Sequence, residues 1–346
     1  MKTDKDIRRI RYLQRSTTLA AFATFALGLA ASRGAVPLYE FTFNDPANGT
    51  QTANSGTANT FANMNKYGTS ASASDRIAAD LHGADASGVS GKPGDYAFAT
   101  GADRMSNIGG TNGQGGTVIL TDAWASLNGL RSWTLQGWYK TEAALPTGGN
   151  SVPLFTLDTR LTIGFSAGAF SITSAVAANQ GADGGTTGNS LTSTAPVLYT
   201  ESAWVFVAVT WDGATGLLSL YAGTENDKTV APVTSASIAS GYLGLRQPDA
   251  THPERDIVIV GDGTGYNRPF KGLMDNVRIY GDRTGSGGAL ALTALQSLMT
   301  ADLAGPVIIP EPANASALAG AVFLLVGALL YRHRCHHRHR RCHRHD

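Results

Sequence analysis

Apolar side chains recur at short intervals through residues 36–285, and long stretches of helical periodicity are nearly absent. In the segment "WTLQGWYK", the alternate positions Trp133, Leu135, Gly137 and Tyr139 fall on one face of an extended chain. The segment "AWVFVAVTW" at 203–211 is almost continuously apolar, as expected of a central strand that is covered on both sides. The pattern therefore predicts a β-protein with buried central strands.

Turn signals separate these strands from one another. "DGATG" at 212–216 predicts a tight turn, and "LLSLYAG" predicts the returning strand. "DIVIVG" and "GLMDNVRIYG" predict two further strands, whereas residues 46–90, rich in Ala, Ser, Asn and Gly, predict long loops. Many short strands with turn signals indicate an all-β fold, specifically a two-sheet antiparallel sandwich or jelly roll.

One helix is predicted near the end of this region. Thr293 and Gln296 have the spacing of a capping box, in which each side chain satisfies a free backbone N–H at the start of a helix. The helix would present an apolar face made of four residues, Leu295, Leu298, Met299 and Leu303.

The N-terminus has the layout of a secretory signal peptide: a basic stretch, then the 13-residue apolar run Leu19–Ala31, then small residues. The run is shorter than the roughly 20 residues that span a bilayer, which favours cleavage over a permanent anchor. We expect the cut between Ala30 and Ala35, so residues 1–35 form the signal peptide. An uncleaved N-terminal anchor is the alternative.

A second apolar segment, Ala313–Tyr331, contains 19 residues without a charge, and six Arg follow it. At about 1.5 Å per residue, a helix of this length crosses the bilayer, and the cationic tail stays cytoplasmic. The expected organisation is then a folded domain over 36–305, a linker over 306–312, a transmembrane helix over 313–331 and a basic tail over 332–346, with residues 36–312 outside the membrane.

The net charge and the cysteine positions differ between the expected exported part and the two ends of the chain. Residues 36–331 hold 14 Lys and Arg against 23 Asp and Glu, a net charge of −9 that disfavours nucleic acid binding. Both cysteines, Cys335 and Cys342, lie in the tail, so the exported domain must fold without disulfides. The tail's His and Cys residues are good zinc ligands, but the dense Arg among them favours a basic stop-transfer segment over a metal site.

Few residues of the exported region suit catalysis. No Glu-x-Asp-x-Glu run is present, although retaining glycosidases need paired carboxylates, and no G-x-S-x-G elbow is present. Only His82 and His252 could act as a base outside the tail. His252 could join Glu254 and Asp256 at a metal, but its Pro-containing, charged segment more simply makes a solvated loop. We therefore predict no catalytic residues.

Two carboxylates and three aromatic residues are the candidate binding groups. Asp275, within an apolar strand, would bind calcium, accept backbone N–H groups, or pair with Arg278 or Lys271. Asp45, at the end of the first strand, is a second calcium candidate. The candidates for stacking on a sugar ring are Trp124, Trp138 and Tyr139, although aromatic residues of a sandwich more often belong to its core.

The C-terminus carries a specific resemblance. Pro310, Glu311 and Pro312, followed by an apolar helix and an Arg-rich end, resemble the PEP-CTERM sorting signal of Gram-negative bacteria, although the His and Cys of this tail are unusual for it. The resemblance implies an exosortase as processing partner, a transient inner-membrane intermediate, cleavage near this motif, and release to the cell surface or an extracellular exopolysaccharide matrix. A plain membrane anchor is the alternative.

The strands carry a second resemblance, over about residues 38–304. "RSWTLQGWYKT", "WVFVAVTWDGATGLLSLYAG" and "RPFKGLMDNVRIYGDRTGSGGALALTALQSL" resemble the LamG-like, concanavalin A-like domain. That family implies a jelly-roll sandwich that binds carbohydrate or protein ligands, sometimes with calcium. An Asp-Ser-Ser-Gly motif of the family is replaced by Asn54-Ser55-Gly56, and its Val-Asp-Gly hairpin by Tyr221-Ala222-Gly223, which weakens the expectation of calcium.

The sequence thus predicts an exported, non-enzymatic surface or matrix protein that binds polysaccharide or another envelope component. A glycoside hydrolase or lyase on the same fold is the alternative function, and a matrix protein without a ligand is the third. The ligand-binding residues are not predicted.

Overall fold

The computed structural model describes twelve stretches of the chain: residues 35–58, 60–67, 76–105, 114–121, 123–146, 151–158, 160–166, 168–182, 189–193, 202–247, 258–262 and 268–306. The chain divides into two compact units, Met1–Gly305 and Pro306–Asp346, and every described residue except Pro306 belongs to the first. The expected signal peptide, PEP motif, transmembrane helix and tail lie outside the described residues. Within the described stretches, no helix is long and apolar enough to cross a membrane.

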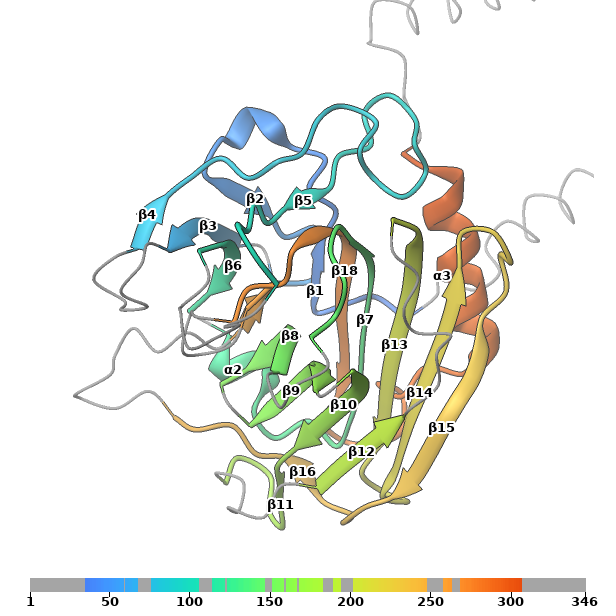
Figure 1. Cartoon of the computed structure of the whole chain (residues 1–346). Coiled ribbons are helices and arrows are strands. Elements are labelled where there is room, and N and C mark those ends of the chain that lie inside the picture. The colour runs from blue at the N-terminus through green and yellow to red at the C-terminus, as the bar shows by residue number, and fades with distance from the viewer. Residues whose placement is uncertain are drawn as a thin grey trace, which may run out of the picture. The chain divides into compact units, whose positions relative to one another are not determined.

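Two antiparallel sheets form the sandwich that the sequence predicts (Figure 1). Sheet A has the order β1-β18-β7-β13-β14-β15, with β5 paired to β18. Its strands are β1 (Tyr39–Phe41), β5 (Phe98–Ala99), β7 (Ser132–Thr141), β13 (Trp204–Asp212), β14 (Leu217–Thr224), β15 (Ala231–Ser237) and β18 (Gly272–Asp282).

Sheet B has the order β12-β10-β9-β8-β17-β6-β3-β2, with β4 paired to β3. Its strands are β2 (Gln51–Ala53), β3 (Phe61–Tyr67), β4 (Arg76–Ala78), β6 (Gly116–Leu120), β8 (Ser151–Leu157), β9 (Leu161–Ser166), β10 (Ala169–Ser174), β12 (Asn189–Ser193) and β17 (Val258–Val260). The remaining elements are a small ladder, β11 (Val176–Ala177) with β16 (Tyr242–Leu243), and the helices η1 (Pro46–Asn48), α2 (Trp124–Leu127) and α3 (Leu292–Ala304).

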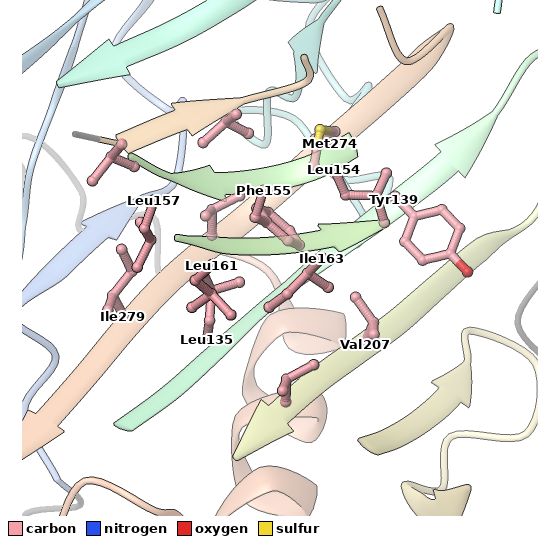
Figure 2. Close-up of a cluster of buried hydrophobic side chains, with 14 of the residues drawn as sticks. Leu135, Tyr139, Leu154, Phe155, Leu157, Leu161, Ile163, Val207, Met274 and Ile279 are labelled. Atoms are coloured by element: carbon pink, nitrogen blue, oxygen red, sulfur yellow. The ribbon is translucent and has the colours of Figure 1, made fainter. Parts of the chain in front are cut away.

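The main core lies between the facing sides of the two sheets. Figure 2 shows Leu135 and Val207 of sheet A in one cluster with Leu161 and Ile163 of sheet B. Burial of a side chain of this size contributes about 1.5–3 kcal/mol, so the interdigitated faces supply much of the stability. Trp133 and Tyr139 belong to this core, which confirms the predicted inward face of β7.

The opposite face of sheet A is also buried, because α3 packs on it (Figure 1). Leu295 and Met299 of α3 lie in one cluster with Trp138 and Phe206, whose rings meet edge to face with centroids 5.3 Å apart. β13 therefore contributes alternate side chains to two cores, as its continuous apolar sequence predicts. The apolar face predicted for the helix is confirmed.

The start of α3 differs from the prediction. Ala291 occupies the N-cap position without a side-chain capping bond, and Thr293 lies inside the helix. Gln296 points elsewhere: its Oε1 accepts the Val230 N–H at 2.8 Å, and its Nε2 donates to the Lys228 carbonyl at 3.0 Å. The predicted capping box is therefore wrong, because Gln296 holds α3 to the β14–β15 connection instead.

The loops predicted for residues 46–90 are also partly wrong. The segment holds η1 and three strands, of which β3 has seven residues. Ala62 and Met64 of β3 are fully buried, while Phe61 is half exposed. Asn and Lys side chains alternate with small apolar ones in this strand, so its hydrophobic pattern is weak although its register is regular.

Candidate functional site

Asp275 lies at a β-bulge in β18. The pairing of β18 with β7 shifts between Asp275 and Arg278, and Asn276 takes a φ of 48°, a left-handed conformation that Asn tolerates better than most residues. The Asp275 side chain is fully buried, its Oδ2 accepting the Val89 N–H at 2.9 Å and its Oδ1 the Asn276 N–H at 2.6 Å. This matches the expectation that Asp275 accepts backbone donors, and it does not pair with Arg278.

Burial raises the pKa of Asp275 well above its usual range, and the nearby Asp95 carboxylate raises it further, whereas the Val89 N–H lowers it. Asp95 is itself buried and accepts bonds from the backbone N–H and the hydroxyl of Ser90, at 2.8 and 2.6 Å. Asp275 therefore anchors the loop that carries Val89 to β18, while Asp95 bonds to Ser90 within that loop. Both oxygens of Asp275 are thus occupied by donors, and calcium at this residue stays a prediction.

Asp45, the second calcium candidate, lies at the start of η1 and joins it to β2. Its Oδ2 accepts the Ala53 N–H at 2.6 Å and the Asn48 side-chain amide at 2.6 Å, and its Oδ1 accepts the Thr52 hydroxyl at 3.1 Å. No three His, Cys, Asp or Glu side chains in the described stretches are grouped to hold a metal ion. Calcium at Asp45 likewise stays a prediction.

His82 is held between two carboxylates. Its Nδ1 lies 2.8 Å from Asp80 Oδ1 and its Nε2 lies 3.4 Å from Asp45 Oδ1, while only 2% of the side chain is exposed. Burial acts to raise the pKa of Asp80, but the contacts with His82 outweigh it and the pKa lies below its ordinary value. Since both ring nitrogens face carboxylates, His82 offers neither of them to a nucleophile.

The aromatic candidates belong to the core. Trp138 and Tyr139 are fully buried, and Trp138 donates its indole N–H to Asp302 Oδ2 at 2.9 Å. Trp124 is half buried and donates to the Leu245 carbonyl at 3.3 Å. Two of the three aromatic residues are therefore closed to a sugar, and the other packs against the core.

A buried ion-pair network under α3 was not predicted. Arg278 of β18 donates Nη1 and Nη2 to the two oxygens of Asp302 at 3.0 and 2.8 Å, and Nε to Glu40 at 2.5 Å. Burial lowers the pKa of Arg278, but Asp302 and Glu40 outweigh it and the pKa lies above its ordinary value. A charged residue within the apolar face of a strand was the signal for this network, because burial of such a charge requires partners.

The outward side of β8, β9 and β10 forms an open groove of about 250 Å³. The strand register places Pro153, Gly164 and Ser171 in one row across the three strands, and Thr162 beside Thr173 in the next. Gly164 has no side chain at the centre of this row, and a larger residue does not fit there because an added Cβ would lie 2.2 Å from the Val152 carbonyl oxygen. The lining is completed by further strand residues, Ser151, Val152, Phe165 and Ser166.

Four hydroxyls of this groove have no hydrogen-bond partner among the described residues: those of Thr162, Ser166, Ser171 and Thr173. Each is at least partly exposed, and each sits on a strand that is fixed by the core beneath it. We call this surface the hydroxyl groove. The sequence does not mark this groove, because Ser and Thr alternating with apolar residues in "LTIGFS" and "AFSITS" are typical of any strand with one face in solvent.

A larger hollow, of about 410 Å³, lies against α3. Its lining is mostly apolar and includes Leu290, Ala294 and Leu298. Its described lining has no charged side chain and three hydroxyl groups, those of Tyr280, Thr293 and Ser297, against five in the hydroxyl groove, so it is less suited to a polar ligand. The remaining sequence candidates, His252, Glu254, Asp256 and the motif Pro310, Glu311 and Pro312, lie outside the described residues.

No protein-family model matches the chain, and no curated protein sequence matches it. Solved structures with a similar arrangement include the binding domain of botulinum neurotoxin serotype D, at 10% identity and a TM-score of 0.43, which covers 77% of this chain and 51% of that one. This chain therefore spans about half the length of the neurotoxin domain.

Two other similar structures are smaller. The Ruminococcus gnavus IT-sialidase CBM40 bound to α2,3-sialyllactose has 15% identity and a TM-score of 0.36, covering 52% of this chain and 90% of that one. The heptameric SAP-like pentraxin from Limulus polyphemus has 14% identity and a TM-score of 0.31, covering 50% of this chain and 71% of that one. The ligand named with the sialidase module is a property of that protein, and the fold assignment here rests on the strand order and pairing of the two sheets.

Proposed function

We propose that this domain is a non-catalytic binding module that attaches an exported protein to a polysaccharide. The observation that carries the proposal is the hydroxyl groove, where four Ser and Thr hydroxyls of the paired strands β9 and β10 have no partner among the described residues. A hydroxyl both donates and accepts hydrogen bonds, which is the bonding capacity of the hydroxyls on a sugar ring. Free, regularly spaced hydroxyls on a sheet therefore complement a chain of sugars.

The groove is fixed before a ligand arrives. Adjacent strands stand about 4.8 Å apart, so the hydroxyls of Thr162 and Thr173 occupy paired positions on neighbouring strands. The two strands are paired with each other, while Phe170 and Ile172 on the inner side of β10 belong to the core. Fixed hydroxyls lose little conformational entropy on binding, which favours affinity from a small number of polar contacts.

The carboxylates of the domain argue against glycoside hydrolysis. A glycosidase needs two carboxyl groups on either side of the scissile bond, and none of the described residues that line the hydroxyl groove carries one. Asp275 and Asp95, two carboxylates that interact with each other elsewhere in the domain, are closed to a substrate by burial. The alternative of a hydrolase or lyase on this fold therefore has no supporting observation among the described residues.

Export and sorting complete the proposal. The N-terminal signal pattern, the motif Pro310–Pro312, the apolar segment Ala313–Tyr331 and the basic tail support processing by an exosortase and display at the cell surface or in an extracellular matrix. In this proposal the sorting signal brings the domain to the cell surface or matrix, and the hydroxyl groove then binds the polysaccharide there.

A glycan array tests the proposed function. The full-length protein, purified in detergent, should bind at least one class of polysaccharide on the array. The double variant Thr162→Val, Thr173→Val should not bind that polysaccharide. Val keeps the shape and strand preference of Thr and removes the hydroxyl. Thr234→Val, on β15 of sheet A, is the matched control and should bind normally. An array run in chelator also shows whether calcium contributes. Absence of binding to every polysaccharide overturns the proposed function.

A further inference from the structure

Arg268 stands at the edge of the hydroxyl groove. Its Nη1 donates to the hydroxyl of Ser151, a lining residue, at 2.7 Å. Its backbone N–H donates to Asp262 Oδ1 at 3.0 Å, which fixes the start of the segment leading into β18. The side chain is exposed. A guanidinium is therefore held against one end of the row of free hydroxyls.

Arg268 differs from three arginines of the domain whose charges are paired with carboxylates. Arg278 is paired with Glu40 and Asp302, Arg246 with Asp158, and Arg104 with Asp103. Arg268 forms no ion pair with a carboxylate in the described stretches, and no carboxylate lines the groove beside it. Its positive charge is thus left available at a surface that otherwise carries hydroxyls.

We propose that the hydroxyl groove binds an acidic polysaccharide, with Arg268 recognising a carboxylate on one sugar while the Ser and Thr hydroxyls bind neighbouring rings. This inference rests on the proposed function and deepens it by naming the ligand class. A guanidinium with free N–H groups binds a carboxylate through two parallel hydrogen bonds, a geometry that a neutral sugar does not reproduce.

The net charge of −9 over residues 36–331 does not oppose this assignment. Charges more than about 8–10 Å away are largely screened at physiological salt, so the local guanidinium governs the contact with a bound carboxylate. The overall negative charge instead predicts that binding of an acidic chain strengthens as salt rises from very low concentration, then weakens when salt screens Arg268 itself.

Binding of two oligosaccharides of equal length tests the inference: an oligogalacturonate, which carries a carboxylate on each sugar, and a neutral malto-oligosaccharide. Full-length protein in detergent is titrated with each by calorimetry. We expect the oligogalacturonate to bind at least about tenfold more tightly, and Arg268→Gln to remove that preference. Arg104→Gln, which removes the same charge from a different loop, should leave both affinities unchanged. An unchanged melting temperature confirms that each variant is folded.

The outcomes separate the two proposals. Equal affinity for the two oligosaccharides, unaffected by Arg268→Gln, overturns the acidic ligand and leaves polysaccharide binding in place. Loss of the acidic preference in Arg268→Gln together with weaker binding of both sugars in Thr162→Val supports the whole groove. A sulfated dextran provides a further arm: if it binds as tightly as the oligogalacturonate, Arg268 recognises negative charge in general, and the carboxylate assignment is wrong.

Discussion

Asp275 illustrates how one residue of this domain joins distant parts of the chain. Its carboxylate bonds to the backbone of Val89, which is 186 positions away in sequence. The bulge at Asn276 and the second carboxylate, Asp95, complete the arrangement. The sequence marks Asp275 as a polar residue in an apolar strand, but the partner is set by tertiary contacts that no local pattern reports.

The raised pKa of Asp275 predicts a specific pH dependence of stability. The folded-state pKa lies above that of an exposed aspartate, about 3.9, so the folded protein retains a proton that the unfolded chain releases. The stabilising contribution is complete below about pH 4 and is lost as the pH rises through the folded-state pKa. The free energy of unfolding of the wild type should therefore fall with rising pH more steeply than that of Asp275→Asn.

Urea unfolding at a series of pH values from 4 upward measures this difference. The Asn variant loses one acceptor for the Val89 or Asn276 N–H, so its stability is lower at acidic pH and approaches the wild-type value as the pH rises. Parallel curves for the two proteins would show that the carboxyl group does not hold its proton on folding.

At the scale of elements, the sequence pattern predicts the buried face of α3 correctly but not the residue at which the helix starts. The spacing of Leu295, Leu298, Met299 and Leu303 predicts the buried face correctly. The predicted helix start and the predicted capping role of Gln296 were wrong, because a capping box requires only two residue types at a fixed spacing and this spacing also arises by chance. Burial against Trp138 and Phe206 determines where the helix lies.

Two single substitutions distinguish the observed start of α3, with Ala291 as N-cap, from a capping box made by Thr293 and Gln296. Gln296→Ala should cost about 1 kcal/mol, since it removes bonds to Val230 and Lys228 that join α3 to the β14–β15 connection. Thr293→Ala should change stability by less than about 0.5 kcal/mol, because this residue caps nothing. Chemical denaturation measures both, and a larger loss for Thr293→Ala would restore the capping box.

The ion pairs beneath α3 give a second prediction at this scale. Arg278→Ala leaves Asp302 buried beside Glu40 without a cation and should cost about 3–5 kcal/mol. The double variant Arg278→Met, Asp302→Leu removes both charges and should be more stable than Arg278→Ala alone. Denaturant midpoints of the three proteins provide the comparison. Equal destabilisation by the single and double variants would mean that α3 depends on the ion pair itself rather than on avoiding an unpaired buried charge.

At the scale of the whole molecule, the sandwich follows from the central strands. The continuous apolar run in β13 predicts a strand covered on both sides, and the alternation in β7 predicts one face made of Trp133, Leu135 and Tyr139; both predictions are confirmed. β3 was missed because its buried residues, Ala62 and Met64, alternate with polar side chains and one of them is small. The hydroxyl groove was missed for a related reason: a Ser or Thr facing solvent and one lining a site have the same sequence pattern, and only the register of three strands brings them together.

Processing of the chain belongs to this scale as well. If the C-terminal signal is recognised, expression in a host with an active exosortase should yield a mature protein that ends near residue 312 by mass spectrometry. The same protein in a host without the enzyme should keep its apolar segment and tail. A mature form that retains Cys335 and Cys342 in the first host would contradict sorting at Pro310–Pro312.

The central claim is that polysaccharide binds to the outward face of β8, β9 and β10. Hydrogen–deuterium exchange of the full-length protein, with and without saturating oligogalacturonate, tests it most directly, because the measurement locates protection along the chain. We predict slower exchange in peptides that cover Ser151–Leu157, Leu161–Ser166 and Ala169–Ser174, together with the segment around Arg268. Protection confined to sheet A or to the loop around Val89, with no change in these three strands, would contradict the account.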